Sequence, residues 1–219
     1  MPPAHPSRRE AGKERRRARI LDVAARLFAE RGVESVTLGD VARAAAVSRP
    51  LVYFYFKDRD ELFQAAVERA NERLYDRFVA AAAAHPRGVD QMEAIGQAYR
   101  AFFEDSPHDF TLLACYNAKP GPAPRPGSLP AKIECHHRDV MELMTAALRR
   151  GFKDGSVRRT LGDPLAVALC LWAFTQGLLQ VTATQGADLK KNHGVDPQHL
   201  VDFGFSLLKT TLAGPKDSH

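Results

Sequence analysis

The sequence has few cysteines, and their number and spacing indicate neither a disulfide framework nor a zinc module. Only Cys115, Cys135 and Cys170 occur in 219 residues, and no two of them have the Cys-x-x-Cys spacing of a zinc module. An odd number of widely spaced cysteines argues against a disulfide framework and fits a reducing compartment. We therefore expect a cytoplasmic protein that needs neither a metal nor a cofactor.

The chain also lacks the alternating pattern of β-strands and an apolar run of membrane-spanning length. The most apolar segment, residues 165–181, is interrupted by Thr175, Gln176 and Gln180, and its unbroken part is shorter than the roughly 20 residues that a spanning helix needs. Residues 1–13 are polar and rich in proline and arginine, and no apolar run follows them, so we expect no signal peptide. The sequence predicts an all-α protein without membrane contact.

No motif of a known catalytic site is present. The sequence contains no nucleophile elbow, no phosphate-binding loop and no paired metal motif. Cys135 precedes His136 and His137, but neighbouring residues on a helix point in different directions, and no second ligand pair stands four residues away. An enzyme that uses Cys115 or Cys135 with a histidine is an alternative that no pattern supports, so we expect neither catalysis nor metal binding.

The excess positive charge lies entirely at the N-terminal end. Residues 1–60 contain 13 lysines and arginines against 8 aspartates and glutamates, whereas residues 61–219 contain 18 of each kind. Because basic side chains neutralise phosphates, this distribution favours a polyanion as the partner of the first quarter of the chain. We expect residues 1–14 to form a disordered basic arm. The following run, residues 15–17, suits a solvated face and a contact with flanking phosphates or a minor groove equally well.

The spacing of apolar residues predicts helices from residue 15 to the end. Residues 15–31 carry one apolar stripe, and capping residues then mark two short helices, one from Thr37 to Ala45 and one from Ser48 to about Phe54. Proline and glycine separate the longer helices that follow. We expect about nine helices, the later ones over residues 62–84, 91–104, 109–117, 131–151, 163–185 and 196–213, with a loop over residues 119–130.

The two short helices have the dimensions of a helix-turn-helix, in which the second helix enters the major groove of DNA. Val47 is the expected buried residue of the turn. The helix N-termini at Thr37 and Ser48 suit phosphate contacts, and Arg49 is the only long donor in the recognition helix that reaches base edges. Of the aromatic residues, we expect Phe54 and Phe56 in the core and Tyr53 and Tyr55 at phosphates. Lys57 is expected to contact a phosphate as well.

Residues 15–63, and above all the segment TLGDVARAAAVSRPLVYFYFKDRDELF, resemble the DNA-binding domain of the TetR family of bacterial regulators. The resemblance implies a DNA-binding domain over residues 15–60 and, over residues 61–219, a larger domain that binds an effector and dimerises. The dimer then forms through residues 163–185 and 196–213. Carried over residue by residue, the DNA contacts are Thr37, Ser48, Arg49, Pro50, Leu51, Tyr53, Tyr55 and Lys57.

Two positions depart from the pattern of the family. Gly39 stands where some members have a base-reading side chain, and Leu51 is apolar where others have a polar residue. Direct readout in this protein therefore depends on Arg49 and on methyl contacts with thymine. The palindromic operator that a dimer implies has no predicted sequence.

Aromatic and sulfur-bearing residues gather in the predicted helices of the larger domain. Each one taken alone is best explained as core, but as a group, with two polar side chains among them, they resemble the lining of an apolar pocket. A planar or lipid-like effector would suit such a pocket. The predicted lining consists of Tyr99, Phe102, Phe103, Phe110, Tyr116, His137, Met141, Met144, Trp172, Phe174 and Gln176.

The sequence thus predicts a DNA-binding transcriptional regulator, most simply a repressor that a small apolar or aromatic effector releases from its operator. A regulator that binds DNA without any effector, its aromatic cluster being all core, is the main alternative.

Overall fold

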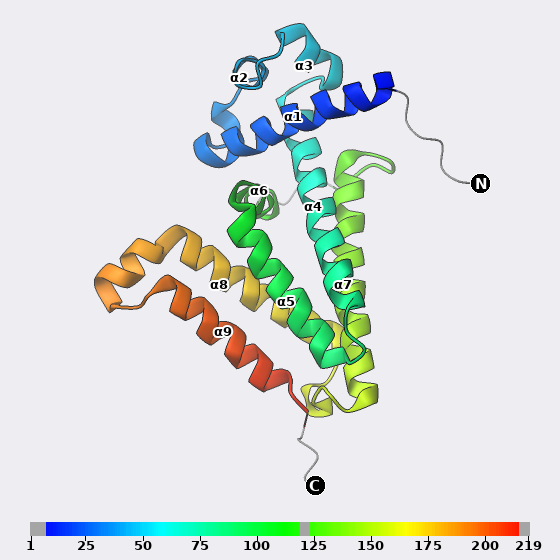
Figure 1. Ribbon diagram of the computed structural model, residues 1–219, viewed down its shortest axis with the longest axis vertical. Coiled ribbons are helices and arrows are strands. Elements are labelled where there is room, and N and C mark those ends of the chain that lie inside the picture. Colours follow the sequence, from blue (N-terminus) through cyan, green and yellow to red (C-terminus); the bar gives the residue numbers. More distant parts are fainter. Residues whose placement is uncertain (1–7, 119–122, 215–219) are drawn as a thin grey trace, which may run out of the picture. The chain divides into compact units, whose positions relative to one another are not determined.

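A computed structural model describes residues 8–118 and 123–214, which fold into nine α-helices and two short 3₁₀ helices (Figure 1). The predicted all-α class is confirmed, and within these ranges the only β-type pairing is an isolated bridge between Val157 and Ala213. The elements are α1 (Arg8–Arg31), η1 (Val33–Ser35), α2 (Leu38–Ala44), α3 (Arg49–Tyr55), α4 (Arg59–Ala83), α5 (Gly88–Asp105), α6 (Pro107–Asn117), α7 (Leu129–Asp154), η2 (Arg159–Leu161), α8 (Pro164–His193) and α9 (Pro197–Leu212).

Several helices are longer than the sequence predicts. Helix α1 starts at Arg8, so residues 8–14 of the expected disordered arm are helical, while residues 1–7 of that arm lie outside the described residues. Helix α8 continues past residue 185 to His193 and ends at Gly194, whose φ of 67° is the left-handed conformation that glycine adopts easily. Charged and polar residues near this end extend the helix without adding to its apolar stripe, which is why the pattern missed them.

The chain divides into two compact units, which share helices α4 and α7. The first unit comprises Met1–Asn71 and Pro107–Glu134, and the second comprises Glu72–Ser106 and Cys135–His219. This division differs from the predicted domains of residues 15–60 and 61–219, because helix α6 packs against α1 in the first unit.

The first unit is built around one face of α1. Ile20, Ala24 and Leu27 are buried on this face, and the ring of Phe28 meets that of Phe63 on α4 edge to face, with 5.5 Å between the centroids. Burial of this stripe is the main term that holds the short helices α2 and α3 in place, since helices of their length are not stable alone.

A half-buried arginine links α4 to α1 in the same unit. The Arg69 guanidinium donates to the carbonyl oxygen of Ala18 at 2.8 Å and to the carboxylate of Asp22 at 2.7 Å. Its side chain is only 12% exposed, so these bonds compensate a charge that would otherwise be costly to remove from water.

The second unit packs α5, α8 and α9 side by side, with α8 and α9 antiparallel (Figure 1). Gly204 lets α9 approach α8 closely, because a Cβ atom there would stand 2.4 Å from the Leu178 side chain. Between α4 and α5, the rings of Phe78 and Tyr99 meet edge to face at 5.8 Å. These contacts fix the helices that surround the cavity described below.

A junction of glycines anchors the C-terminal end of α9. The N–H of Gly214 donates to the Ser156 carbonyl at 2.9 Å, and the N–H of Arg158 donates to the Leu212 carbonyl at 2.9 Å. A Cβ atom on Gly214 would lie 2.2 Å from the Gly155 carbonyl oxygen, so the close approach requires glycine. The end of α9 is thereby tied to the chain between α7 and α8.

Candidate DNA-binding helices and effector cavity

Helix α2 begins with a complete capping box, in which the predicted capping residue Thr37 is the N-cap. The Thr37 hydroxyl accepts from the N–H of Asp40 at 3.2 Å, and the Asp40 carboxylate accepts from the N–H of Thr37 at 3.1 Å. Hydrogen bonds from the Thr37 side chain and backbone lower the pKa of Asp40, which keeps this carboxylate ionised. The capping box therefore satisfies the N–H of Asp40 near the exposed start of α2.

The turn between α2 and α3 is tight. Ala46 has a φ of 51°, the left-handed region that residues other than glycine seldom adopt, and Val47 donates its N–H to the Ala42 carbonyl at 3.0 Å. We predicted Val47 to be the buried residue of the turn, but it is half-buried, and Ala45 is the residue that is fully buried. A small side chain at 45 allows the two helices to pack closely.

Helix α3 has one buried face and one exposed face. Val52 and Phe56, four residues apart, are buried, whereas 69% of Phe54 is exposed. The prediction that Phe54 and Phe56 are both core is wrong, because residues two apart on an α-helix point about 200° apart. Tyr53 is exposed as predicted, and Tyr55 is half-buried.

The exposed start of α3 carries the predicted base-reading side chain. The Arg49 guanidinium donates to the Tyr53 hydroxyl at 3.4 Å and lies 5.6 Å from the centre of that ring. Ser48 precedes the helix, and its hydroxyl makes no capping hydrogen bond, so it is available to another acceptor or donor. Arg49 and Ser48 thus stand together at the helix end whose dipole attracts phosphate.

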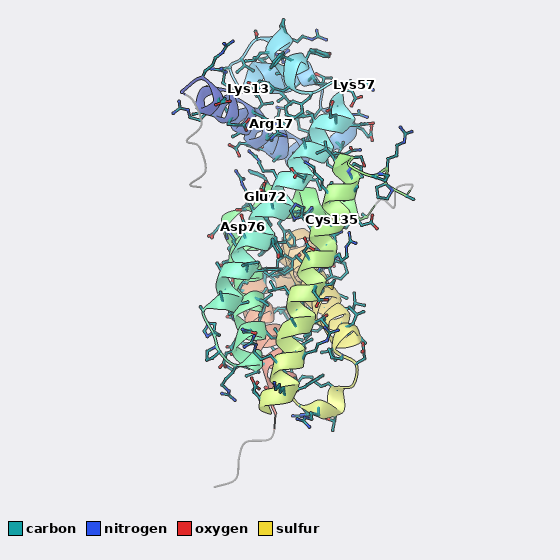
Figure 2. All side chains as sticks on the ribbon, turned by 90° about the vertical axis from the view of Figure 1, so that its right-hand side faces the viewer. Lys13, Arg17, Lys57, Glu72, Asp76 and Cys135 are labelled. Atoms are coloured by element: carbon teal, nitrogen blue, oxygen red, sulfur yellow. The ribbon has the colours of Figure 1, made fainter. Side chains whose placement is uncertain are left out.

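The N-terminal turns of α1 lie against the end of α3. Tyr55 donates its hydroxyl proton to the Lys13 carbonyl at 3.2 Å, and the Lys13 ammonium lies 5.6 Å from the centre of the Phe54 ring. Arg17 lies 5.7 Å from the centre of the Phe56 ring. Figure 2 shows Lys13 and Arg17 on α1, and Lys57 at the entry to α4. Basic side chains of α1 therefore lie beside the aromatic residues at the end of α3.

The structure brings all eight predicted DNA contacts together in the first unit. Thr37, Ser48, Arg49, Pro50, Tyr53 and Lys57 are exposed, while Leu51 and Tyr55 are half-buried. Phe54 and Lys13 share this surface and were missed. The 3.6-residue period of α3 indicates the exposure of Phe54, whereas nothing in the local pattern indicates that α1 extends back to Lys13.

The second unit contains a cavity of about 320 Å³ between α5, α8 and α9, with Phe78 of α4 and Met144 of α7 in its wall. This volume lies at the lower end of the range for small-molecule sites, roughly 300–1,000 Å³. Its inner surface is mainly apolar. The side chains that form it include Met92, Ile95, Tyr99, Leu171, Trp172, Phe205, Leu208 and Leu212.

Only three of the eleven predicted pocket residues, Tyr99, Met144 and Trp172, line this cavity. Phe110 and Tyr116 belong to the first unit, and the other six are in the second unit but outside the lining. Phe102 is fully buried under the Arg77 guanidinium, Phe174 is 43% exposed, and Gln176 accepts a hydrogen bond from the Tyr99 hydroxyl. Phe103, His137 and Met141 are half-buried.

Helix α9 contributes much of the lining, which the sequence did not suggest. We predicted that residues 196–213 form part of the dimer interface, and the predicted pocket lining therefore lacks Phe205, Leu208 and Leu212. Burial raises the pKa of the Tyr99 hydroxyl well above its ordinary value, so this group stays protonated inside the unit. A neutral hydroxyl and an apolar wall favour an occupant that is largely apolar.

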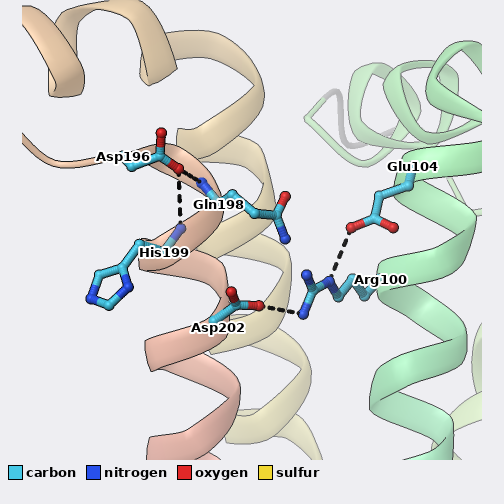
Figure 3. A network of polar contacts seen from close by, with 6 residues as sticks. All are labelled: Arg100, Glu104, Asp196, Gln198, His199 and Asp202. Carbon is cyan, nitrogen blue, oxygen red and sulfur yellow. Dashed lines mark hydrogen bonds and ion pairs between the residues drawn. The ribbon is translucent and has the colours of Figure 1, made fainter.

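Four charged residues line the same cavity and form ion pairs from α5 to α9. Arg100 donates to Asp202 at 2.6 Å, and Lys209 donates to Glu93 at 2.8 Å. Arg100 also donates through Nε to Glu104 at 3.0 Å, one turn further along α5 (Figure 3). Hydrogen bonds from Arg100 to Glu104 and Asp202 raise the pKa of Arg100, so its charge is permanent.

Among residues 8–118 and 123–214 no three histidine, cysteine, aspartate or glutamate side chains gather where an ion could be held. All three cysteines are exposed and free.

An exposed recognition helix preceded by a capped supporting helix, joined to a helical unit with an apolar cavity, defines a helix-turn-helix regulator of transcription. The sequence profile of "Bacterial regulatory proteins, tetR family" matches residues 20–66, and that of "Tetracyclin repressor-like, C-terminal domain" matches residues 92–207. The chain belongs to the TetR family of DNA-binding transcriptional regulators.

Individual relatives agree with this assignment. The chain is 36% identical over 167 residues to the transcriptional regulator AlkX of Mycobacterium tuberculosis, covering 74% of this chain and 76% of AlkX. It is 27% identical over 158 residues to the transcriptional repressor KstR2 of Rhodococcus jostii, covering 71% and 74%. A crystal structure of a TetR-family protein from Rhodococcus RHA1 has the same fold, with a TM-score of 0.72 at 18% identity over 92% and 98% of the two chains.

Proposed function

We propose that this regulator is a cytoplasmic repressor without catalytic activity that binds a palindromic operator as a homodimer and leaves it when a small apolar or aromatic molecule fills the cavity. The cavity between α5, α8 and α9 is the observation that supports a small-molecule effector. A relative of this chain, KstR2, is named a transcriptional repressor, which supports repression rather than activation.

The exposed apolar faces of α8 and α9 support the homodimer. Leu165, Leu169 and Phe174 on α8 and Phe203 and Leu207 on α9 are all more than a third exposed. Contiguous apolar surface of this kind marks an interaction site, and a two-fold axis would bury it against the same surface of a second copy. Two recognition helices then reach half-sites about 34 Å apart on DNA.

The apolar character of α8 has a competing explanation. The helix has 30 residues, and its best 18-residue window has a mean hydropathy of 1.6, so by length and composition it meets the requirement for a membrane span, contrary to our argument from an interrupted run. Only 22% of that window is buried. We assign the exposed apolar residues to the homodimer, because the helix also contains Thr175, Gln176 and Gln180, polar side chains that are costly inside a membrane.

Helix α4 is the proposed link between effector and DNA. It runs from Arg59 in the first unit to Ala83 in the second, and Phe78 stands in the cavity wall. Near its start, the Glu61 carboxylate accepts from the N–H of Lys57 at 2.7 Å. A ligand that displaces Phe78 shifts the helix that holds the end of the DNA-binding segment, and a modest rotation is enough to separate the recognition helices from their half-sites.

The test uses N-phenyl-1-naphthylamine, an uncharged aromatic fluorophore, with an operator selected from random duplex DNA. Trp172 is the only tryptophan and lines the cavity, so binding should change its emission and raise the melting temperature. By linkage, the probe must weaken operator binding by the factor by which the operator weakens probe binding. Binding of the probe with unchanged operator affinity would contradict the effector role and favour a regulator that acts without one.

A further inference from the structure

Arg100 and Asp202 face each other across the opening of the cavity. Figure 3 shows Arg100 extending from α5 between Glu104 on its own helix and Asp202 on α9. The Nη1 atom of Arg100 lies 2.6 Å from an oxygen of Asp202, and both residues line the cavity. Asp202 is half exposed to solvent, so the pair lies where the cavity meets water.

The two partners of this ion pair differ in burial. The Arg100 side chain is 22% exposed, whereas that of Asp202 is 54% exposed. A buried charge that loses its partner is costly, whereas an exposed carboxylate that turns into water loses little. Asp202 is therefore the member that can leave, provided that another anion takes its place on Arg100.

Of the two ion pairs described above that line the cavity, the Arg100 pair holds the most buried charge, 22% exposed against 38% for Glu93, so this pair decides which charge an occupant can carry. A cationic molecule would have to compete with Arg100 for Asp202 and leave the more buried guanidinium with Glu104 alone. An anionic molecule keeps Arg100 paired and releases only Asp202. A guanidinium has five N–H donors. In Arg100, Nε donates to Glu104 and Nη1 donates to Asp202. The planar edge of the guanidinium suits a carboxylate.

We propose that the occupant of the cavity is an apolar molecule that ends in a carboxylate, and that this carboxylate replaces Asp202 on Arg100. The inference rests on the proposed effector function and adds the chemistry of the head group. The apolar body lies against Met92, Trp172 and Phe205, and the head group lies at the opening. Replacement removes the ion pair between Arg100 and Asp202, and the pair between Lys209 and Glu93 still joins α5 to α9.

The experiment compares three probes of equal chain length on the full-length protein: decanoate, decan-1-ol and decylammonium. Binding is followed by Trp172 fluorescence and by calorimetry. We expect decanoate to bind roughly tenfold more tightly than decan-1-ol, because charge-assisted hydrogen bonds to Arg100 are available only to the carboxylate. Decylammonium should bind most weakly.

Two substitutions have opposite expected effects. Arg100→Gln should abolish the preference for decanoate over decan-1-ol. Asp202→Asn removes the competing charge, so it should tighten decanoate binding several-fold and leave decan-1-ol unchanged. Arg149→Gln is the control, because Arg149 forms an exposed ion pair with Glu142 at 3.4 Å and does not line the cavity. If Arg100→Gln does not fold, Asp202→Asn decides alone.

Equal binding of the three probes, tighter binding of decylammonium, or no binding of any probe would overturn the assignment of the head group. Equal binding accompanied by loss of operator affinity would leave the proposed effector function intact. The expected preference without any change in operator affinity would support the carboxylate site and contradict the effector function instead.

Discussion

Arg49 projects from the first turn of α3 and is steadied by Tyr53, whose hydroxyl and ring it contacts. A bidentate contact of such an arginine with guanine contributes about 1–3 kcal/mol of discrimination. Arg49→Ala should therefore weaken operator binding by that amount and relax base preference at one position in each half-site. Binding to operator variants, measured by anisotropy, checks this expectation.

Lys57→Ala provides the contrast at the same surface. The Lys57 side chain is 86% exposed and has only a long contact of 3.9 Å with Asp58, so we expect it to meet phosphate. Its loss should weaken all sequences alike and reduce the salt dependence of binding. Unchanged base preference in Arg49→Ala, or altered preference in Lys57→Ala, would refute the assigned roles.

At the scale of single residues, the sequence predicted what depends on local chemistry. The expected DNA contacts in α2 and α3 follow from the N-cap positions and from the family resemblance, and the structure places these residues in one unit. Phe54 was misplaced because a strand-like alternation was applied to a helix. The cavity was largely missed, since its lining depends on how α9 packs against α5, and no local pattern records that packing.

At the scale of the element, the two short helices start differently. Thr37 closes a capping box, whereas Ser48 makes no capping hydrogen bond through its side chain. Thr37→Ala should cost about 0.5–2 kcal/mol of stability, the usual range for a lost cap, and Ser48→Ala much less. Urea unfolding of both variants measures the difference, and an equal loss would show that the capping box does not stabilise α2.

Helix boundaries show where sequence patterns stop being informative. The starts of α2, α8 and α9 agree with the predicted boundaries, because the side-chain oxygen of the residue before each helix, which satisfies a free N–H, is encoded locally. The extension of α1 back to Arg8 and of α8 to His193 involves mostly polar residues without a stripe. Such turns depend on helix continuation and on tertiary contacts, such as that of Tyr55 with the Lys13 carbonyl.

For the whole molecule, the exposed faces of α8 and α9 predict assembly. Phe203→Glu or Leu207→Glu should dissociate the homodimer, because either introduces a charge into an apolar interface. Val79→Glu, at an exposed apolar site on α4, should leave the assembly unchanged. Sedimentation velocity at micromolar concentration distinguishes the two species. A wild-type monomer that partitions into lipid vesicles would instead favour the membrane explanation of α8.

Helix α9 has two working faces and one fixed end. Phe203 and Leu207 lie on its exposed side, Phe205 and Leu208 line the cavity, and its last residues are tied at the glycine junction. In the proposed homodimer, α9 therefore forms part of the wall of the effector cavity and also part of the interface with the other subunit. Filling the first cavity then changes the energy of filling the second, so the two effector sites of the homodimer are energetically coupled.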